Sequence, residues 1–199
     1  AFDVLLDWYT GQQDIVVGTG VANRTRVETE GLIGFFVNTV VLRADLSGGP
    51  TFREVVRRVR EATLGAYAHQ ETPFEMLVET LLPERDPSYT PLFQVMFILQ
   101  NMSLTAYELP ELRVRVSGLG TERATAKFDL YLAMTEDADG LGGTLEYNTD
   151  LFDAATAERM MAYFRSLLEE VTGNPDREID GLSLMSDEES GRLIYDFNG

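Results

Sequence analysis

A nearly unbroken apolar run follows a glycine-flanked loop, and it restricts the fold of this chain more than any other stretch. The run is Phe36-Val37-Asn38-Thr39-Val40-Val41-Leu42-Arg43, and the loop before it contains Gly31 and Gly34. A short run of apolar and β-branched residues is typical of a strand that is covered on both faces. We therefore expect residues 36–43 to form a central strand of a sheet.

One polar side chain, Asn38, interrupts this expected strand and shares a face with Phe36, Val40 and Leu42. Asparagine is unfavourable in strands and is costly to bury without a hydrogen-bond partner. Two interpretations follow from the pattern. Asn38 either hydrogen-bonds to a neighbouring loop or faces a functional site.

The rest of the chain alternates between strand and helix patterns. We expect helices up to Thr10, from the capping boxes Thr51-Phe52-Arg53-Glu54 and Thr72-Pro73-Phe74-Glu75, and from Asp153 to Gly173. Further strands are expected at residues 14–18, 93–99, 112–116, 128–134 and 145–147, the last two as a hairpin across a turn at 137–143. Residues 19–30 have the composition of a polar loop. This order predicts an α/β two-layer sandwich, with helices packed on a mixed β-sheet.

Composition excludes several classes of function. The 199 residues, 44% of them hydrophobic, are enough for a real core, and the net charge of −17 argues against nucleic acid and anionic membranes as partners. No apolar run is long enough to span a membrane. The absence of cysteine excludes thiolate catalysis and is consistent with a cytoplasmic location, and the single histidine, His69, excludes a multi-histidine metal site within one chain. We expect no metal site and no bound cofactor.

Motifs for common catalytic sites are also missing. Gly18-Thr19-Gly20 lacks the third glycine of a phosphate-binding loop and opens no helix. A Ser–His pair could use only His69, whose place at a helix junction indicates a capping or packing role. From the residues alone, the chain is an α/β domain that we expect to be part of something larger.

Three motifs, in order and at the right separations, resemble those of the condensation domains of nonribosomal peptide synthetases. Residues 33–39 with Arg43 are similar to I-G-x-F-V-N-T…R, residues 69–75 to H-Q-D-x-P-F-E, and residues 85–92 to R-D-x-S-R-N-P-L. The flanking residues agree as well, so the resemblance covers nearly the whole chain. Gly20, Tyr89 and Thr90 depart from the residues usual at their positions.

The resemblance implies a chloramphenicol-acetyltransferase-like lobe of a two-lobed domain that joins acyl or peptidyl groups to an amine. In such domains donor and acceptor arrive as thioesters on the phosphopantetheine arms of carrier proteins and meet in a tunnel between the lobes. The family's histidine motif, H-H-x-x-x-D-G, belongs to the N-terminal lobe and is absent here. We therefore expect residues 1–175 to be the C-terminal lobe and residues 176–199 a linker towards an adenylation domain.

The resemblance also marks candidate residues and partners. It assigns no catalytic residue to this chain, and the fragment is expected to be inactive alone. The expected partners are the N-terminal lobe, peptidyl carrier proteins and the adenylation domain. An alternative is a non-catalytic platform that binds a carrier or another partner. The candidates for the tunnel or its motifs are Gly18, Thr19, Arg24, Gly34, Asn38, Thr39, Arg43, His69, Gln70, Pro73, Phe74, Arg85 and Asp86.

Overall fold

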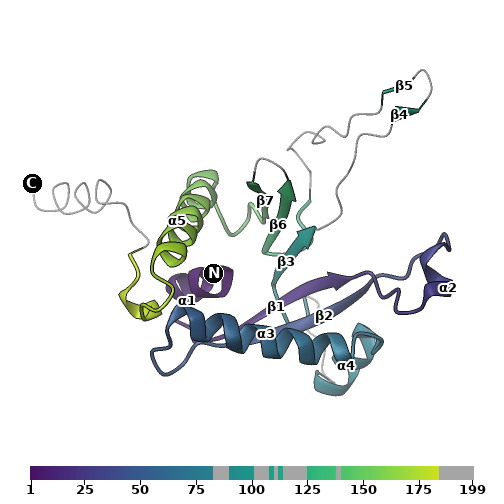
Figure 1. Ribbon diagram of the computed structural model, residues 1–199, viewed down its shortest axis with the longest axis horizontal. Coiled ribbons are helices and arrows are strands. Elements are labelled where there is room, and N and C mark those ends of the chain that lie inside the picture. The colour runs from purple at the N-terminus through teal and green to yellow at the C-terminus, as the bar shows by residue number, and fades with distance from the viewer. Residues whose placement is uncertain (83–89, 101–107, 110–111, 114–124, 138–139, 184–199) are drawn as a thin grey trace, which may run out of the picture.

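The computed structural model describes residues 1–82, 90–100, 108–109, 112–113, 125–137 and 140–183. The helices are α1 (Phe2–Thr10), α2 (Val27–Glu30), α3 (Phe52–Ala68), α4 (Phe74–Leu81) and α5 (Ala154–Gly173), with a 3₁₀ turn η1 (Ile179–Gly181). The strands are β1 (Asp14–Val21), β2 (Asn38–Asp45), β3 (Val95–Gln100), β4 (Glu108–Leu109), β5 (Leu112–Arg113), β6 (Leu130–Asp137) and β7 (Gly140–Tyr147). This arrangement confirms the predicted α/β fold with helices on a mixed sheet (Figure 1).

The main sheet has five strands in the order β2-β1-β3-β6-β7. β1 runs antiparallel to β2 and parallel to β3, β3 runs parallel to β6, and β6 and β7 form the predicted antiparallel hairpin. Both hairpin strands are longer than their alternating patterns indicated, so only residues 138–139 separate them. β4 and β5 form a separate two-stranded ribbon, which contains the first two residues of the strand expected at 112–116. Val114 and Val116 lie outside the described residues.

The expected central strand is instead an edge strand, and it starts later than predicted. β2 begins at Asn38, and within the described sheet it pairs only with β1. The apolar residues before it lie in an exposed loop, where Phe35 is 92% exposed and Val37 is 53% exposed. The apolar run is therefore divided between two elements. One is a strand covered by helix α3, and the other is a loop whose apolar side chains face outward.

Residues 19–30 also differ from the polar loop that was expected. β1 continues through Val21 because its second half pairs with the start of β2, with Thr19 opposite Val40 and Val21 opposite Asn38. Residues 27–30 form the single helical turn α2.

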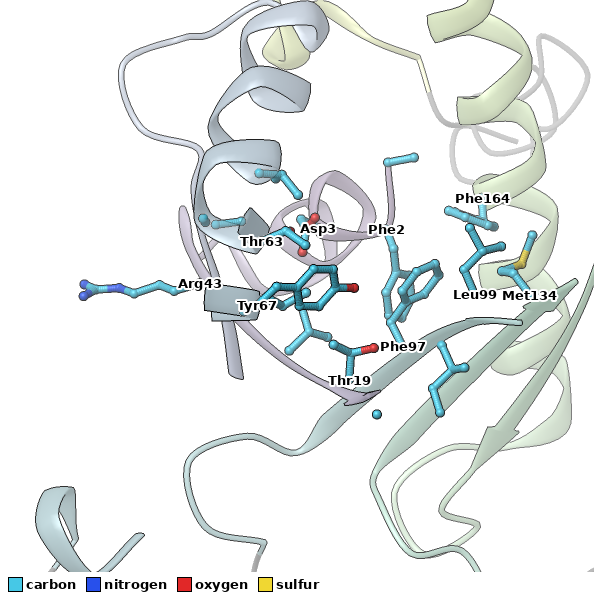
Figure 2. A pocket seen from close by; sticks show the side chains of 18 of the residues that line it. Phe2, Asp3, Thr19, Arg43, Thr63, Tyr67, Phe97, Leu99, Met134 and Phe164 are labelled. Atoms are coloured by element: carbon cyan, nitrogen blue, oxygen red, sulfur yellow. The ribbon is translucent and has the colours of Figure 1, made fainter. Parts of the chain in front are cut away.

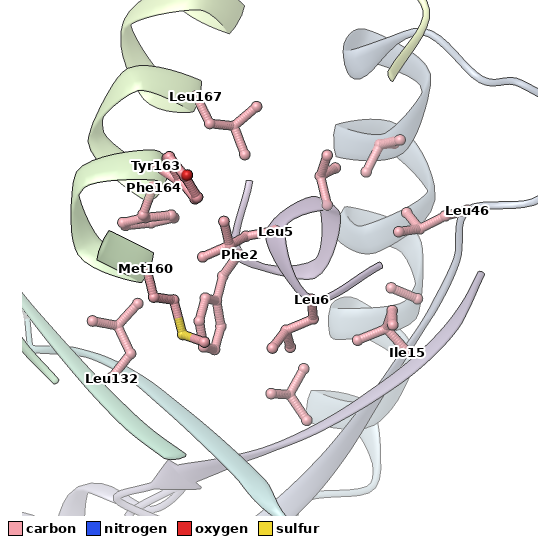
Figure 3. Packing of buried hydrophobic residues seen from close by; sticks show 14 of the residues in the cluster. Phe2, Leu5, Leu6, Ile15, Leu46, Leu132, Met160, Tyr163, Phe164 and Leu167 are labelled. Atoms are coloured by element: carbon pink, nitrogen blue, oxygen red, sulfur yellow. The ribbon is translucent and has the colours of Figure 1, made fainter. Parts of the chain in front are cut away.

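The helices α5, α1 and α3 lie over the sheet, with α1 between the other two (Figure 3). α1 ends as predicted at Gly11, which adopts φ of 67° and donates its backbone N–H to the Asp7 carbonyl. Its buried side chains pack against strand residues and against the apolar face of α5. The core cluster includes Phe2, Leu5, Leu6, Ile15, Leu132, Met160, Phe164 and Leu167. Among the described residues, no helix is long and apolar enough to cross a membrane.

The two expected capping boxes form only in part. At α3 the Thr51 hydroxyl accepts a hydrogen bond from the Glu54 backbone N–H at 3.3 Å, as predicted, but the Glu54 carboxylate binds Arg57 and Arg58 instead of a first-turn amide. At α4 the box does not form. Pro73 is the N-cap residue, with an extended backbone at φ −60° and ψ 135°, so the helix starts at Phe74.

The start of α5 matches its prediction, and the segment after it packs on the domain. The Asp153 carboxylate accepts from the Thr156 backbone N–H at 2.6 Å. Beyond the helix, the carbonyls of Arg177 and Pro175 accept from the first backbone N–H groups of α3, at Phe52 and Arg53. Residues 175–179 therefore close the N-terminal end of α3, a contact that the acidic composition of this segment did not indicate.

Candidate functional site

Several of the candidate residues meet where β1 ends and β2 begins. The pairs Gly20–Thr39 and Val21–Asn38 bring the end of β1 against the start of β2. The junction between α3 and α4 lies against the same place, because it is tied to Asn38. Two motifs whose contacting residues, Asn38 and Gln70, lie 32 positions apart in the chain are thus joined in space.

Asn38 makes that connection with its side-chain amide. Its Nδ2 donates to the backbone carbonyls of Gln70 and Thr72, both at 2.7 Å, and the residue is half-buried. This is the loop-holding interpretation of Asn38. The partners are backbone atoms, so the Gln70 side chain takes no part in these two hydrogen bonds.

Arg24 holds the loop that leads into β2. Its guanidinium donates to the carbonyl of Thr29 and, at 3.5 Å each, to those of Glu30 and Gly34. The same group stacks over the Phe36 ring, 4.3 Å from its centroid. One side chain therefore fixes the loop from α2 to the start of β2, and Gly34 serves this site through its carbonyl.

The loop held by Arg24 presents apolar side chains to solvent. Residues 27–37 are here called the apolar loop. Their exposed apolar side chains are Val27, Leu32, Ile33, Phe35 and Val37, and Ile33 is fully exposed. A gathering of exposed apolar side chains on one short segment is typical of an interaction surface.

Gly18 and Phe74 meet around one buried ring. Phe93 is 2% exposed and packs against Phe74 and Phe128, with ring centroids 5.7 Å apart in each pair. A Cβ at Gly18 would come within 2.3 Å of the Phe93 ring, so only glycine fits at this position. The phenylalanine of the second motif therefore serves packing, and it links α4 to the sheet.

His69 lies at the C-terminal end of α3, where its backbone N–H donates to the Ala66 carbonyl and its carbonyl accepts from Thr72. The residue is exposed, at the edge of a polar recess that also contains Thr25 and Glu71, which are hydrogen-bonded to each other at 2.8 Å. The position agrees with the expected capping role at a helix junction. It places the imidazole on the surface of the described part of the chain.

The remaining candidates lie elsewhere. Arg43 is at the far end of β2, where its guanidinium forms two 2.7 Å hydrogen bonds with the Asp14 carboxylate and lowers the pKa of that exposed carboxyl. Thr19 is buried in the second half of β1. Arg85 and Asp86 lie outside the described residues. The predicted site residues are thus only partly brought together.

The sequence patterns did not indicate one cavity that lies beneath the helices, among the described residues. It has a volume of about 480 Å³ and lies between the first turn of α1, the second half of α3, α5 and the sheet. Phe2, Phe97, Met134 and Phe164 form its apolar side, while Thr63 and Tyr67 enter from α3 and the Arg43 side chain points away (Figure 2). Burial raises the pKa of the Asp3 carboxyl on its wall. The small residue Ala62 in the apolar stripe of α3 was the available sequence signal for this cavity.

The geometry supports positioning better than acid–base chemistry. The groups that hold the motif segments together are amides, backbone carbonyls, a guanidinium and aromatic rings, none of which transfers a proton near neutral pH. Within the described residues, no group of three or more His, Asp or Glu side chains could hold a metal ion. This end of the sheet is therefore held in place by side-chain hydrogen bonds and lies beside the exposed apolar loop.

Comparisons with known proteins agree on one family. The family model described as Condensation domain matches residues 1–194. One of the linear gramicidin synthase proteins of Brevibacillus parabrevis is 54% identical over 198 residues, which are 100% of this chain and 4% of that protein. The chain thus spans a small fraction of the curated relatives that it matches.

Solved structures show the same fold. A four-domain nonribosomal peptide synthetase bound to AMP and glycine matches with a TM-score of 0.84 and 29% identity, over 96% of this chain and 15% of that one. The X-domain in complex with OxyB from teicoplanin biosynthesis matches with a TM-score of 0.80 and 35% identity, over 93% of this chain and 41% of that one.

Proposed function

Because this chain belongs to the condensation-domain family of nonribosomal peptide synthetases, we propose that it is the C-terminal lobe of such a domain. In this role it supplies one wall of the tunnel in which an amide bond forms. The observation that carries the proposal is the brace at the start of β2, where Asn38 and Arg24 hold two motif segments and the apolar loop without a proton-transfer group.

The chemistry of amide formation explains why a wall of this kind is useful. An amine must approach a thioester carbonyl within about 3–3.5 Å, and the tetrahedral intermediate needs stabilisation. Binding surfaces that fix the two substrates supply the first requirement. A titratable group at the meeting point would come from the N-terminal lobe, which in this family contains the histidine motif.

The partners follow from the same proposal. Peptidyl carrier proteins deliver donor and acceptor on phosphopantetheine arms, so the lobe itself holds no cofactor. The N-terminal lobe covers the apolar loop of residues 27–37. An adenylation domain follows residues 176–199, which act as the linker.

A condensation assay tests the proposal. We expect no amide product above background when the 199-residue chain is mixed with loaded donor and acceptor carriers, as read by mass spectrometry of the acceptor carrier. The same chain joined to its N-terminal lobe in one polypeptide is expected to form product. Product from the 199-residue chain alone would contradict the half-site proposal.

A second candidate function is a non-catalytic platform. The likeness to the X-domain, whose structure is a complex with OxyB, favours it. The two functions differ in the expected state of the N-terminal lobe: an intact histidine motif supports catalysis, and a degraded one supports the platform. Failure of the joined polypeptide to form product, together with stable binding of another protein, would favour the platform.

A further inference from the structure

We propose that Gly20, in the second half of β1, determines the size of the side chain that the carrier-bound substrate can have. Its missing side chain leaves room on the sheet for an apolar group of that substrate. The inference rests on the proposed function and adds to it a position that selects among substrates. The substrate is an aminoacyl or peptidyl thioester with an apolar side chain, on either the donor or the acceptor carrier.

A side chain at position 20 would point away from helices α1, α3 and α5. Side chains alternate between the two faces of a strand, and Val17 and Thr19 of β1 line the cavity beneath these helices. The Cβ position of Gly20 lies on the other face, 3.6 Å from Ile98 Cδ1 and 3.9 Å from Met96 Cε. Gly20, Ile98 and Met96 are half-buried within the described part of the chain. This part of the sheet is therefore partly accessible.

The packing of the lobe does not require a glycine at position 20. Separations of 3.6 and 3.9 Å are ordinary van der Waals contacts, so an alanine methyl group fits among the described residues, and the φ of Gly20 is not positive. Gly18 is different, because the Phe93 ring fills the space of its Cβ. Glycine weakens the interior of a strand, and a glycine there often marks a place where another group approaches closely.

Gly20 lies beside the residues that hold the candidate site together. Its partner across the sheet is Thr39, and the next pair is Val21 with Asn38, whose side chain holds the junction between α3 and α4. A group that lay over Gly20 would therefore lie next to the tunnel wall of the proposed function. Gly20 is also one of the positions at which this chain departs from the residues usual in its family. Such a departure fits a position that differs with the substrate.

The surroundings of Gly20 favour an apolar group. Ile98 and Met96 offer aliphatic and thioether surface, and a methionine side chain adapts to groups of different shape. Thr39, on the same face as its partner Gly20, is uncharged and half-buried. A charged group would lose water here without gaining an ion pair from these three side chains.

The variant Gly20→Val, in the polypeptide that joins both lobes, tests the proposal. Condensation rates are measured with carriers that bear an alanyl or a leucyl group, varied first on the donor and then on the acceptor. We expect the ratio of leucyl to alanyl kcat/KM to fall about tenfold in one of the two series, which identifies the carrier concerned. The alanyl rate should stay within about twofold of that of the natural sequence.

Gly173→Val is the matched control. No atom lies within 4 Å of the Gly173 Cβ position, and this residue ends α5, next to the segment that closes the N-terminal end of α3. The junction held by Asn38 is at the other end of α3. Gly173→Val should therefore leave the ratio of leucyl to alanyl rates unchanged.

The contrary outcomes are distinct. Equal changes in the leucyl and alanyl rates of Gly20→Val, or no change in either, would overturn the proposal. A lower Tm of Gly20→Val in the joined polypeptide, without such a fall in the 199-residue chain, would also overturn it, because the other lobe would then cover Gly20. A joined polypeptide of natural sequence that forms no product would refute the proposed function itself, and this inference with it.

Stability gives a measurement that does not depend on turnover. Gly20→Ala should leave the Tm of the 199-residue chain unchanged or raise it by a few degrees, because the methyl group fits and glycine is unfavourable in a strand. A Tm lowered by several degrees would show that the fold itself requires glycine at this position, which would overturn the proposal.

Thiol labelling tests the contact directly, because the 199-residue chain contains no cysteine. In the joined polypeptide, a carrier that bears a leucyl group through a non-hydrolysable amide should slow the iodoacetamide alkylation of Gly20→Cys about tenfold, as read by mass spectrometry of the peptide that contains it. The alkylation of Leu151→Cys, at a 59% exposed position, should not change. Equal protection of Gly20→Cys by a carrier with an unloaded phosphopantetheine arm would overturn the proposal, because the arm and not the side chain would then lie over Gly20.

Discussion

At the scale of single residues, the site depends on groups that hold backbone in place. Asn38 is costly in a strand unless it is paired, and it is paired with two carbonyls of a segment that begins more than thirty residues later. Gly18 has no Cβ, and this leaves room for the Phe93 ring to pack against the sheet. Both residues are explained by contacts that are remote in sequence.

Asn38→Ala is expected to lower the free energy of unfolding by about 1–3 kcal/mol, because two carbonyls lose their donors. Chemical denaturation measures this change. Gln70→Ala is the control, since Gln70 contributes its backbone carbonyl to Asn38, and it should cost much less. Equal stability of Asn38→Ala and the natural chain would show that these hydrogen bonds contribute nothing.

Gly18→Ala is expected to destabilise the domain by about 1–3 kcal/mol through overpacking against the Phe93 ring, which a new Cβ would approach to 2.3 Å. Gly65→Ala is the opposite case, because no atom lies within 4 Å of that Cβ position inside α3. Alanine there should stabilise the helix by about 0.5–1 kcal/mol. Thermal unfolding of the two variants should therefore shift in opposite directions.

At the scale of elements, partly exposed ion pairs organise the outer face of α3. The Glu54 carboxylate accepts from Arg57 Nη2 at 2.7 Å and from Arg58 Nε at 3.1 Å. These hydrogen bonds lower the pKa of Glu54 from its ordinary 4.5 to about 2. A carboxyl with a lowered pKa in the folded state stabilises the fold above its unfolded pKa, and this contribution is lost as the pH falls.

Between pH 4.5 and about 2, the natural chain should therefore lose stability more steeply than Glu54→Gln. The glutamine amide cannot titrate, so the curve of stability against pH for Glu54→Gln lacks this contribution. Adding about 1 M salt should reduce the difference, because exposed charges are screened. Parallel stability curves at low salt would show that the ion pairs do not contribute.

Sequence patterns identified elements better than they identified neighbours. The α1 stop at Gly11, the Asp153 cap and the 130–147 hairpin depend on local chemistry, and all three were predicted. The edge position of β2 was not predicted. An apolar run has the same sequence pattern whether it lies in a covered strand or in an exposed loop. The start of α4 was predicted one residue too early. The Thr72 carbonyl accepts a hydrogen bond from the Asn38 side chain, and the local sequence around Thr72 does not indicate this contact.

The candidate site shows the same division. The motif resemblance selected Asn38 and Arg24, which act at the start of β2, but it also selected Arg43, which pairs with Asp14 at the other end of the strand. The cavity was missed because its walls come from α1, α3, α5 and the sheet. Such a space depends on helix lengths and on packing, which no single periodic pattern contains.

At the scale of the whole molecule, the exposed apolar loop has a consequence in solution. Ile33 is fully exposed and Phe35 is 92% exposed, and large uncovered apolar patches rarely stay solvated. The 199-residue chain should self-associate as its concentration rises, and light scattering measures its mass. Ile33→Ser with Phe35→Ser should reduce association, whereas Leu151→Ser should not. A monomer across a wide concentration range would refute this.

The proposed function requires that this lobe positions substrates and lacks the proton-transfer group of the reaction. His69 is the one histidine of the chain, and it lies exposed at the end of α3. The decisive variant is His69→Ala in the polypeptide that joins both lobes, with product on the acceptor carrier measured by mass spectrometry. We predict a rate within about threefold of that of the natural sequence. A loss of about a hundredfold or more at unchanged Tm, the size expected for a general acid or base, would show instead that this lobe supplies the proton-transfer group.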